Sequence, residues 1–271
     1  MTLEVHVIGI GLLGPGLPSW AQAQVLLCEP AGWHTAATVV PPPARLPATE
    51  RRRAGTLVKA SLVVADEAVA GVGVGVGVHA GTGVDVATLA TVFTSSTGDP
   101  LNCHLLCEAL ALPQRAVSPT RFTNSVHNAP AGYWHIAAAS RAPSTSLAAF
   151  DASFGAGLLE AAVQCQATQA PVLLVACDVP YPEPLHTLRP LADVFAVALL
   201  LAPGGGRLLT LKLDGDAADT TCKHAGLEAL RAGIPAARAL PLLQALAQGA
   251  AARVVLEGAP GLAMQLDLAA A

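Results

Sequence analysis

Asp151 is the residue whose position most suggests chemistry. Residues 144–149 have the pattern of a strand and run without a spacer into Phe150-Asp151-Ala152-Ser153, after which leucines and small residues recur at helical spacing. This pattern predicts a strand–turn–helix elbow, which holds one side chain at the tip of a strand beside the free amides of a helix N-terminus. Such elbows commonly present a nucleophile. The carboxylate of Asp151 also has a purely structural interpretation, as the N-cap of the following helix.

A second group of reactive side chains consists of Cys103, His104 and Cys107, three potential metal ligands within five residues. On a helix the two cysteines share a face, whereas the histidine points about 100° away. No second pair of ligands follows at the spacing of a zinc site, so we expect no metal. We expect both cysteines to pack in the core. The cysteines are scattered through a sequence that looks cytosolic, so no disulfides are expected among Cys28, Cys103, Cys107, Cys165, Cys177 and Cys222.

Two histidines, His127 and His135, precede the elbow on a helix predicted over residues 125–139. They lie nearly on one face of that helix but about 12 Å apart along its axis, so they do not form a catalytic pair. We expect His127 and Asn128 to be buried and satisfied by local hydrogen bonds.

Gly9, Gly11 and Gly14 have the spacing of a dinucleotide-binding turn and follow a predicted strand at residues 3–10. Such a turn needs a helix that begins within the motif and an acidic residue at the end of a second strand about 20 positions further on. Pro15 and Pro18 interrupt the helix, and the acidic residue is missing. A nucleotide-dependent oxidoreductase is therefore disfavoured, and we expect no cofactor.

The elements that would position these residues alternate between strands and helices. The predicted elements are strands at 3–10, 84–95 and 171–177, helices at 51–68, 100–111 and 240–248, a hairpin of 195–202 with 208–213, and strands at 253–257 and 264–268. Residues 71–78 alternate Gly and Val and predict a loop. This order implies a parallel or mixed sheet covered on both faces, hence the α/β class, in a single domain of residues 1–271.

The composition narrows the classes of partner. With 19 acidic and 15 basic residues among 271, the net charge is −4, which argues against electrostatic binding of nucleic acid. The N-terminus lacks the pattern of a signal peptide and residues 68–84 are too rich in Gly for a membrane span, so we expect a cytoplasmic protein. Arg51, Arg52 and Arg53 begin the predicted helix 51–68. A solvated face is their simplest interpretation, and contact with a phosphate or a partner is the alternative.

The residues around the elbow resemble a known family. The run Arg141-Ala-Pro-Ser144-Thr-Ser-Leu-Ala-Ala-Phe-Asp151 resembles the elbow of β-ketoacyl synthases, in which an RGPS loop and a short strand lead to the nucleophilic cysteine. Aligned on this loop, the cysteine position falls on Asp151. The runs SPTRF-x-NSVHNAPAGYW and STSLAAFDASF are similar to the short chain-length-factor-like subunits of aryl polyene, or xanthomonadin-type, pigment pathways. The resemblance covers about residues 1–215 and implies a thiolase-like fold, half of a synthase, with 216–271 as a C-terminal extension.

The resemblance implies a subunit without catalytic residues of its own. A condensing synthase needs a thiolate to accept the acyl chain, and it needs two histidines from its second half. Residues 216–271 contain one histidine, His224, which lies outside any synthase-like motif. A carboxylate is a poor substitute, because an acyl-Asp would be an anhydride and the negative charge repels the developing oxyanion. The implied protein is a chain-length-factor-like partner in a heterodimer with a ketosynthase, which shapes the acyl tunnel in type II polyketide or fatty-acid-like synthesis and meets an acyl carrier protein through the complex.

In dimers of this fold the strand before the elbow pairs with its counterpart in the other subunit. We therefore expect interface or tunnel positions along that strand and the helix before it, at Phe122, Asn128, Tyr133, Trp134, Ser144, Thr145, Ser146, Leu147, Ala148, Ala149 and Phe150. Ordinary core packing is the alternative for the three aromatic residues upstream. A function of another class is a stand-alone hydrolase or decarboxylase of half-thiolase shape that uses Asp151 with His127 or Cys177.

Overall fold

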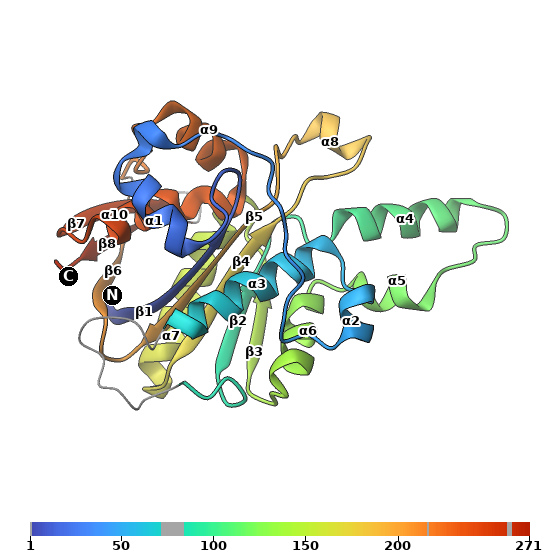
Figure 1. The fold of residues 1–271 in the computed structure, drawn as a ribbon, viewed down its shortest axis with the longest axis horizontal. Helices are drawn as coiled ribbons and strands as arrows, with labels where there is room; N and C mark the ends of the chain where they lie inside the picture. Colours follow the sequence, from blue (N-terminus) through green and yellow to red (C-terminus); the bar gives the residue numbers. More distant parts are fainter. Residues whose placement is uncertain (1, 72–83, 216, 259–261) are drawn as a thin grey trace.

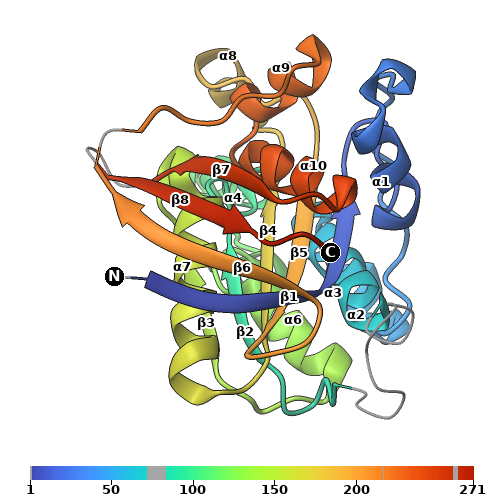
Figure 2. The same cartoon turned by 90° about the vertical axis from the view of Figure 1, so that its left-hand side faces the viewer.

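The computed structural model describes residues 2–71, 84–215, 217–258 and 262–271, so the Gly-Val segment predicted as a loop lies, except for Gly71, outside the described residues. Its centre is a mixed eight-stranded sheet with the strand order β3-β2-β4-β5-β1-β6-β8-β7 (Figure 1, Figure 2). The strands are β1 (Thr2–Leu13), β2 (Ala90–Thr94), β3 (Ser144–Leu147), β4 (Val172–Asp178), β5 (Phe195–Ala202), β6 (Arg207–Asp214), β7 (Ala252–Glu257) and β8 (Ala263–Leu268). The helices are α1 (Trp20–Cys28), α2 (Ala48–Arg53), α3 (Thr56–Ala70), α4 (Pro100–Ala111), α5 (Pro119–Asn124), α6 (Ala129–Ala138), α7 (Ser153–Thr168), α8 (Leu185–Leu188), α9 (Ala225–Gly233) and α10 (Leu240–Gln248).

Both faces of the sheet are buried, which explains the continuous apolar sequence of β4. Alternate residues of β4, beginning with Val172, pack in a core shared with α1, α7, α9 and α10. The residues between them, beginning with Leu173, pack in a second core shared with α3 and α6. A strand buried on both faces has no polar side. The three layers, helices on each side of a mixed sheet, confirm the predicted α/β class.

Strand β1 lies inside the sheet and separates two strands that were predicted to form a hairpin. It pairs antiparallel with β5, where His6 lies opposite Ala202, and with β6, where His6 lies opposite Leu208. Strands β5 and β6 are therefore not neighbours, and the hairpin prediction is wrong. Because β5 is buried along its whole length, both of its edges need hydrogen-bonding strands, and β1 and β4 supply them.

The glycines at the N-terminus allow a helix to pack closely on β1. A Cβ atom on Gly9 would lie 2.1 Å from the carbonyl oxygen of Ala68, and one on Gly11 would lie 1.9 Å from that of Val64. Both carbonyls belong to α3, so its backbone rests directly on the strand. Strand β1 continues through these glycines to Leu13, and the next helix, α1, begins only at Trp20. Close packing thus accounts for the spacing that resembles a dinucleotide-binding motif.

Two predicted elements are shorter than expected for local reasons. Strand β2 begins at Ala90 rather than at 84, because Asp85 forms a turn: its side chain accepts a hydrogen bond from the amide of Ala87 at 3.0 Å. The helix predicted over 51–68 is two helices, since the chain is extended at Ala54 and Gly55. The three arginines consequently end α2 and do not begin the apolar helix α3.

The first four residues of the helix predicted over 125–139 instead form a turn, which lies between α5 and α6. Helix α6 begins at Ala129, with Pro130 in its first turn and Asn128 as its N-cap residue. His127 lies in the turn, so the helical spacing that related it to His135 does not apply. His127 and Asn128 are both exposed, and the prediction that they are buried is wrong.

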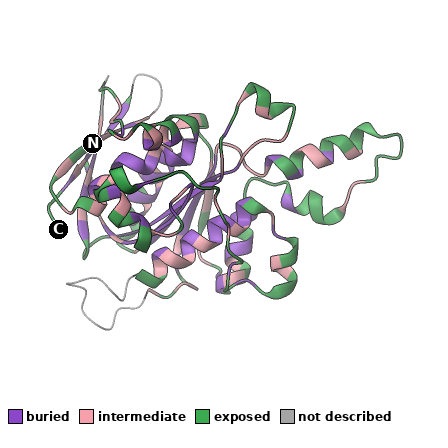
Figure 3. Cartoon of the chain, turned by 45° about the horizontal axis from the view of Figure 1, so that its top comes forward, coloured by how far each residue is buried: buried purple, intermediate pink, exposed green. Residues whose placement is uncertain are grey.

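Helices α4 and α5 form an arm that projects from the body of the molecule (Figure 1). Asp99 caps α4: its carboxylate accepts a hydrogen bond from the amide of Asn102 at 3.1 Å. Much of the arm's surface is exposed (Figure 3). Cys103 and Cys107 are among its exposed residues, so the prediction that they pack in the core is wrong. Among the described residues, no group of three His, Cys, Asp or Glu side chains is arranged to hold a metal ion.

Residues after 215 complete the sheet. Strand β8 pairs with β6, and β7 pairs with β8 at the edge. The buried guanidinium of Arg207 in β6 donates hydrogen bonds to the carbonyl oxygens of Ala245 at 2.6 Å, Leu246 at 3.0 Å and Ala269 at 2.8 Å. The segment expected as an extension is thus tied to the same sheet. Within the described ranges, none of the helices combines the length and apolar character needed to cross a membrane.

Candidate functional site

The elbow before α7 is formed by a short strand and a strained turn. Strand β3 ends at Leu147, two residues earlier than predicted, and Phe150–Ala152 form a 3-10 turn that leads into α7. Phe150 has a φ of 52°, in the left-handed region that non-glycine residues rarely occupy. Ser153 stabilises this turn: its Oγ accepts from the amide of Ala149 at 3.0 Å and donates to the carbonyl of Phe150 at 2.7 Å. The predicted strand–turn–helix elbow is confirmed.

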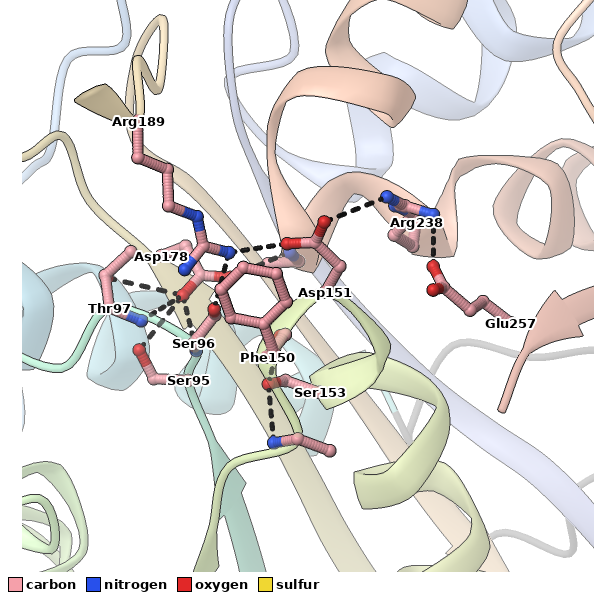
Figure 4. Close-up of polar contacts among 12 residues, drawn as sticks. Ser95, Ser96, Thr97, Phe150, Asp151, Ser153, Asp178, Arg189, Arg238 and Glu257 are labelled. Atoms are coloured by element: carbon pink, nitrogen blue, oxygen red, sulfur yellow. Dashed lines mark hydrogen bonds and ion pairs between the residues drawn. The ribbon is translucent and has the colours of Figure 1, made fainter. Parts of the chain in front are cut away.

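The carboxylate of Asp151 binds two arginines (Figure 4). Its Oδ1 lies 2.5 Å from Nη2 of Arg189, and its Oδ2 lies 3.5 Å from Nη2 of Arg238. Asp151 does not cap α7, whose N-cap residue Ala152 makes no side-chain hydrogen bond to the helix. The N-cap interpretation is therefore wrong, because two cations draw the carboxylate away from the helix amides.

Both arginines are held by further contacts. The guanidinium of Arg189 stacks on the ring of Phe150, 3.8 Å from its centroid, and donates to Oγ of Ser96 at 3.0 Å. Arg238 also forms an ion pair with Glu257. The elbow therefore carries a network of alternating charges in which each carboxylate oxygen of Asp151 faces one guanidinium group. A carboxylate held in this way is a weak nucleophile.

A buried carboxylate, Asp178, organises the loop beside the elbow (Figure 4). At the end of β4 it accepts hydrogen bonds from the side chain of Ser95, the amide of Ser96, and the amide and hydroxyl of Thr97. Its second oxygen accepts from the amide of Ala236 at 2.8 Å. Burial raises the pKa of Asp178 above its ordinary value, although these hydrogen bonds act in the opposite direction. Asp178 thereby fixes Ser96, a partner of Arg189, relative to the sheet.

The side chains considered as catalytic partners of Asp151 have other contacts. Nε2 of His127 lies 3.1 Å from the carbonyl oxygen of Ser95. The thiol of Cys177 is buried, lies 3.8 Å from the carbonyl oxygen of Leu57, and has a pKa raised by burial. Neither is among the hydrogen-bond or ion-pair partners of Asp151 in the described part of the chain. Sequence reasoning missed Arg189 and Arg238, since no local pattern links them to the elbow.

The expected interface positions fall into two groups. The strand and the start of the elbow lie at the sheet edge, where β2 is the one partner of β3 among the described strands. Their residues are exposed or half-buried: Ser144, Thr145, Ser146, Leu147, Ala148, Ala149 and Phe150. Phe122 on the arm is 67% exposed. Tyr133 and Trp134 instead lie in the core beneath α3, so the alternative of core packing describes them. The hydroxyl of Tyr133 donates to the side chain of Asn124 at 3.0 Å.

An apolar pocket of about 480 Å³ adjoins the elbow. Phe150 and Asp151 form one side of it, and Leu159 of α7 and Met264 of β8 lie among its apolar lining. Glu257, the second partner of Arg238, also lines it. The charged network and an apolar cavity are therefore neighbours.

A comparison with protein-family models now identifies the family. Residues 20–258 match the model described as the N-terminal domain of β-ketoacyl synthase. The chain belongs to the β-ketoacyl synthase family. At the sequence level, no curated protein matches it.

Solved structures of β-ketoacyl synthases and their partners share the fold at low sequence identity. One is the ketosynthase ApeO in complex with its chain length factor ApeC from Xenorhabdus doucetiae, with 23% identity, 98% of this chain and 99% of that chain covered, and a TM-score of 0.72. Another is AntDE:AntF, a type II polyketide carrier protein in complex with its ketosynthase, with 12% identity, complete coverage of both chains and a TM-score of 0.75. The ishigamide ketosynthase/chain length factor has 14% identity, 98% and 99% coverage, and a TM-score of 0.68. These similarities confirm the thiolase-like fold.

Proposed function

We propose that the chain is a non-catalytic, chain-length-factor-like partner of a ketosynthase in aryl polyene-type biosynthesis. The observation that carries this proposal is the state of Asp151, which occupies the cysteine position of the β-ketoacyl synthase elbow and is bound by Arg189 and Arg238. Condensation requires a thiolate that becomes a thioester, whereas this carboxylate is engaged in ion pairs. The elbow keeps its turn and lacks the nucleophile.

The surface around the elbow supports a heterodimer. Strand β3 is at the edge of the sheet, and an edge strand presents unpaired backbone groups to another strand. The arm adds an apolar groove of about 500 Å³ whose lining includes Leu106, Leu110 and Phe122. Exposed apolar surface of this kind marks an interaction site. A ketosynthase that pairs with β3 and covers the groove satisfies both features, and ApeO with ApeC is a complex of this kind.

The pocket beside the elbow supports a role in shaping the acyl tunnel. Its lining is apolar apart from Asp151 and Glu257. An apolar lining is what the binding of an acyl chain requires. The pocket is next to Phe150, which is 65% exposed and stands beside the open edge of β3. In the heterodimer this pocket extends the cavity that receives the acyl chain made at the partner's catalytic cysteine.

The test is co-expression with a candidate partner ketosynthase of the aryl polyene type, followed by native mass measurement and a condensation assay with carrier protein. We expect a one-to-one complex whose activity is lost when the partner's nucleophilic cysteine becomes alanine and is kept in Asp151→Ala. The variant Leu159→Trp narrows the pocket and is expected to shorten the product without changing the complex mass. A lone chain that hydrolyses or decarboxylates acyl thioesters, and loses this activity in Asp151→Ala, would show that Asp151 is catalytic.

A further inference from the structure

Two exposed cysteines lie side by side on the arm. Cys103 and Cys107 are both on α4, four positions apart, and both are exposed. Residues at this spacing are neighbours on one face of a helix. The two thiols are close enough to share a hydrogen bond. Neither residue lines the apolar pocket at the elbow or the apolar groove of the arm, so the proposed function leaves this thiol pair unused.

Helix α4 holds the two cysteines at a fixed spacing. Asp99 caps its first turn, and the amide of Cys103 donates to the carbonyl oxygen of Asp99 at 3.1 Å. The side chain of Asn102, a residue that is 8% exposed, donates from Nδ2 to the carbonyl oxygen of Arg121 in α5 at 2.7 Å. The backbone of the pair is therefore anchored to the second helix of the arm. The distance between the two sulfur atoms changes only by rotation of the cysteine side chains.

This spacing suits an ion held between the two sulfur atoms better than a direct bond between them. Cβ atoms four positions apart on a helix are separated by about 5 to 6 Å. A disulfide needs a Cβ–Cβ distance of about 3.8 Å, so it would distort α4. Two metal–sulfur bonds of about 2.3 Å each, the length found at zinc, span up to about 4.6 Å between the sulfur atoms. An ion bound by both sulfurs therefore allows α4 to keep its helical geometry.

The number of ligands at the pair determines which ion fits. His104 is the nearest other metal-binding side chain in the sequence, but its Nε2 lies 3.2 Å from Oε1 of Glu108, on another face of the helix. Within the described ranges, no third His, Cys, Asp or Glu side chain joins the pair. Zinc takes four ligands, which excludes it here. Thiolates are soft ligands that select monovalent copper, and this closed-shell ion is stable with two thiolates on opposite sides.

We propose that Cys103 and Cys107 form a two-coordinate site for monovalent copper on the arm. When the ion binds, two S–H bonds are replaced by two Cu–S bonds and two protons pass to the solvent. Copper stays in the +1 state and the sulfur atoms are not oxidised, so the step needs no oxidant or reductant. The site depends only on α4 and is independent of the role of Asp151.

The proton on Cys103 opposes binding of the ion at neutral pH. Burial raises the pKa of this thiol, and the neighbouring Cys107 and Asp99 act in the same direction. The ion therefore has to displace a proton, and its apparent affinity rises with pH.

The test is an anaerobic titration of the full chain with Cu(I), supplied as its acetonitrile complex, in competition with the coloured chelator bicinchoninate. We expect one Cu(I) per chain and the ultraviolet charge-transfer band of thiolate-bound copper. Cys103→Ser and Cys107→Ser should each weaken binding by at least about 100-fold, because each leaves one thiolate and loses the chelate. Cys28→Ser removes the exposed thiol of α1 and is the control, which should leave binding unchanged.

A relocated thiol separates the geometry of the site from the number of cysteines. Cys107→Ser combined with Glu108→Cys keeps two cysteines on α4 but moves one of them about 100° around the helix. We expect this double variant to bind Cu(I) no more tightly than Cys107→Ser, with far-ultraviolet circular dichroism confirming that it is folded. Wild-type affinity in this variant or in Cys103→Ser, or loss of binding in Cys28→Ser, would show that the proposal is wrong.

Native mass of the copper-loaded chain provides a second readout. One ion on one chain is the expected result. One ion on two chains would overturn the proposal, because the ion would then join two copies and not two thiols of one helix. None of these measurements involves the condensation assay, so this proposal and the proposed function can fail separately.

Discussion

Replacing Asp151 with alanine removes the carboxylate that two guanidinium groups share at the elbow, and the geometry predicts unequal consequences for the two arginines. Arg189 lies 2.5 Å from Asp151, its one carboxylate partner in the described part of the chain. Arg238 lies 3.5 Å away and keeps Glu257, with Asp219 at 3.8 Å. The side chains of Asp151, Arg189 and Arg238 are 35%, 27% and 17% exposed, between the surface and the buried case. We expect a coupling energy of about 1 to 2 kcal/mol for Asp151 with Arg189, and less than about 0.5 kcal/mol for Asp151 with Arg238.

Two double-mutant cycles, read by urea unfolding, measure these couplings. One combines Asp151→Ala with Arg189→Met and the other combines it with Arg238→Met, since methionine keeps part of the apolar stem of arginine. The stacking of Arg189 on Phe150 is lost in both the single and the double variant and cancels in the cycle. Equal couplings, or none for Arg189, would refute the assignment of Asp151 as a carboxylate held mainly by Arg189.

Three further outcomes follow from features elsewhere in the fold. Asp178→Ala leaves several buried donors without an acceptor and should cost about 3 to 5 kcal/mol in urea unfolding, and a loss below about 1 kcal/mol would contradict its role. Gly11→Ala should destabilise by about 1 to 3 kcal/mol because its Cβ atom meets a carbonyl oxygen of α3 at 1.9 Å. Gly132→Ala, in open space, is the control and should not destabilise. Alkylation of the native chain, followed by mass spectrometry, should modify exposed Cys103 faster with rising pH and leave buried Cys177 unmodified, and the reverse order would show that α4 packs differently.

Features that depend on neighbouring residues could be predicted from the sequence. The apolar run of β4 predicted a strand buried on both faces, and the small residues after Asp151 predicted the helix that follows the elbow. The cap of α4 by Asp99 is also a local feature, because it joins residues three positions apart. In each case the sequence signal lies in the composition or spacing of neighbouring residues.

Features that depend on distant residues could not be predicted from the sequence. Arg189 and Arg238 bind Asp151 from 38 and 87 positions away, and nothing near either arginine indicates that contact. The prediction that Cys103 is buried relied on the average behaviour of cysteine, whereas the arm carries this residue away from either core. Similarly, the sequence showed the triple arginine, but it did not show that α3 and α5 bring Lys59 and Arg121 to the same polar cavity as Arg52 and Arg53.

The position of β1 also determines when the sheet can close during synthesis. The ribosome makes β1 first, but both of its neighbours are late: His6 lies opposite Ala202 in β5 and Leu208 in β6. Until β5 and β6 emerge, the backbone groups of β1 have no native partner, and its apolar residues can join non-native strands. We therefore expect nascent chains shorter than about residue 214 to be protease-sensitive and to rely on chaperones. A central strand that precedes both of its partners in the chain thus delays closure of this sheet until β5 and β6 have been made.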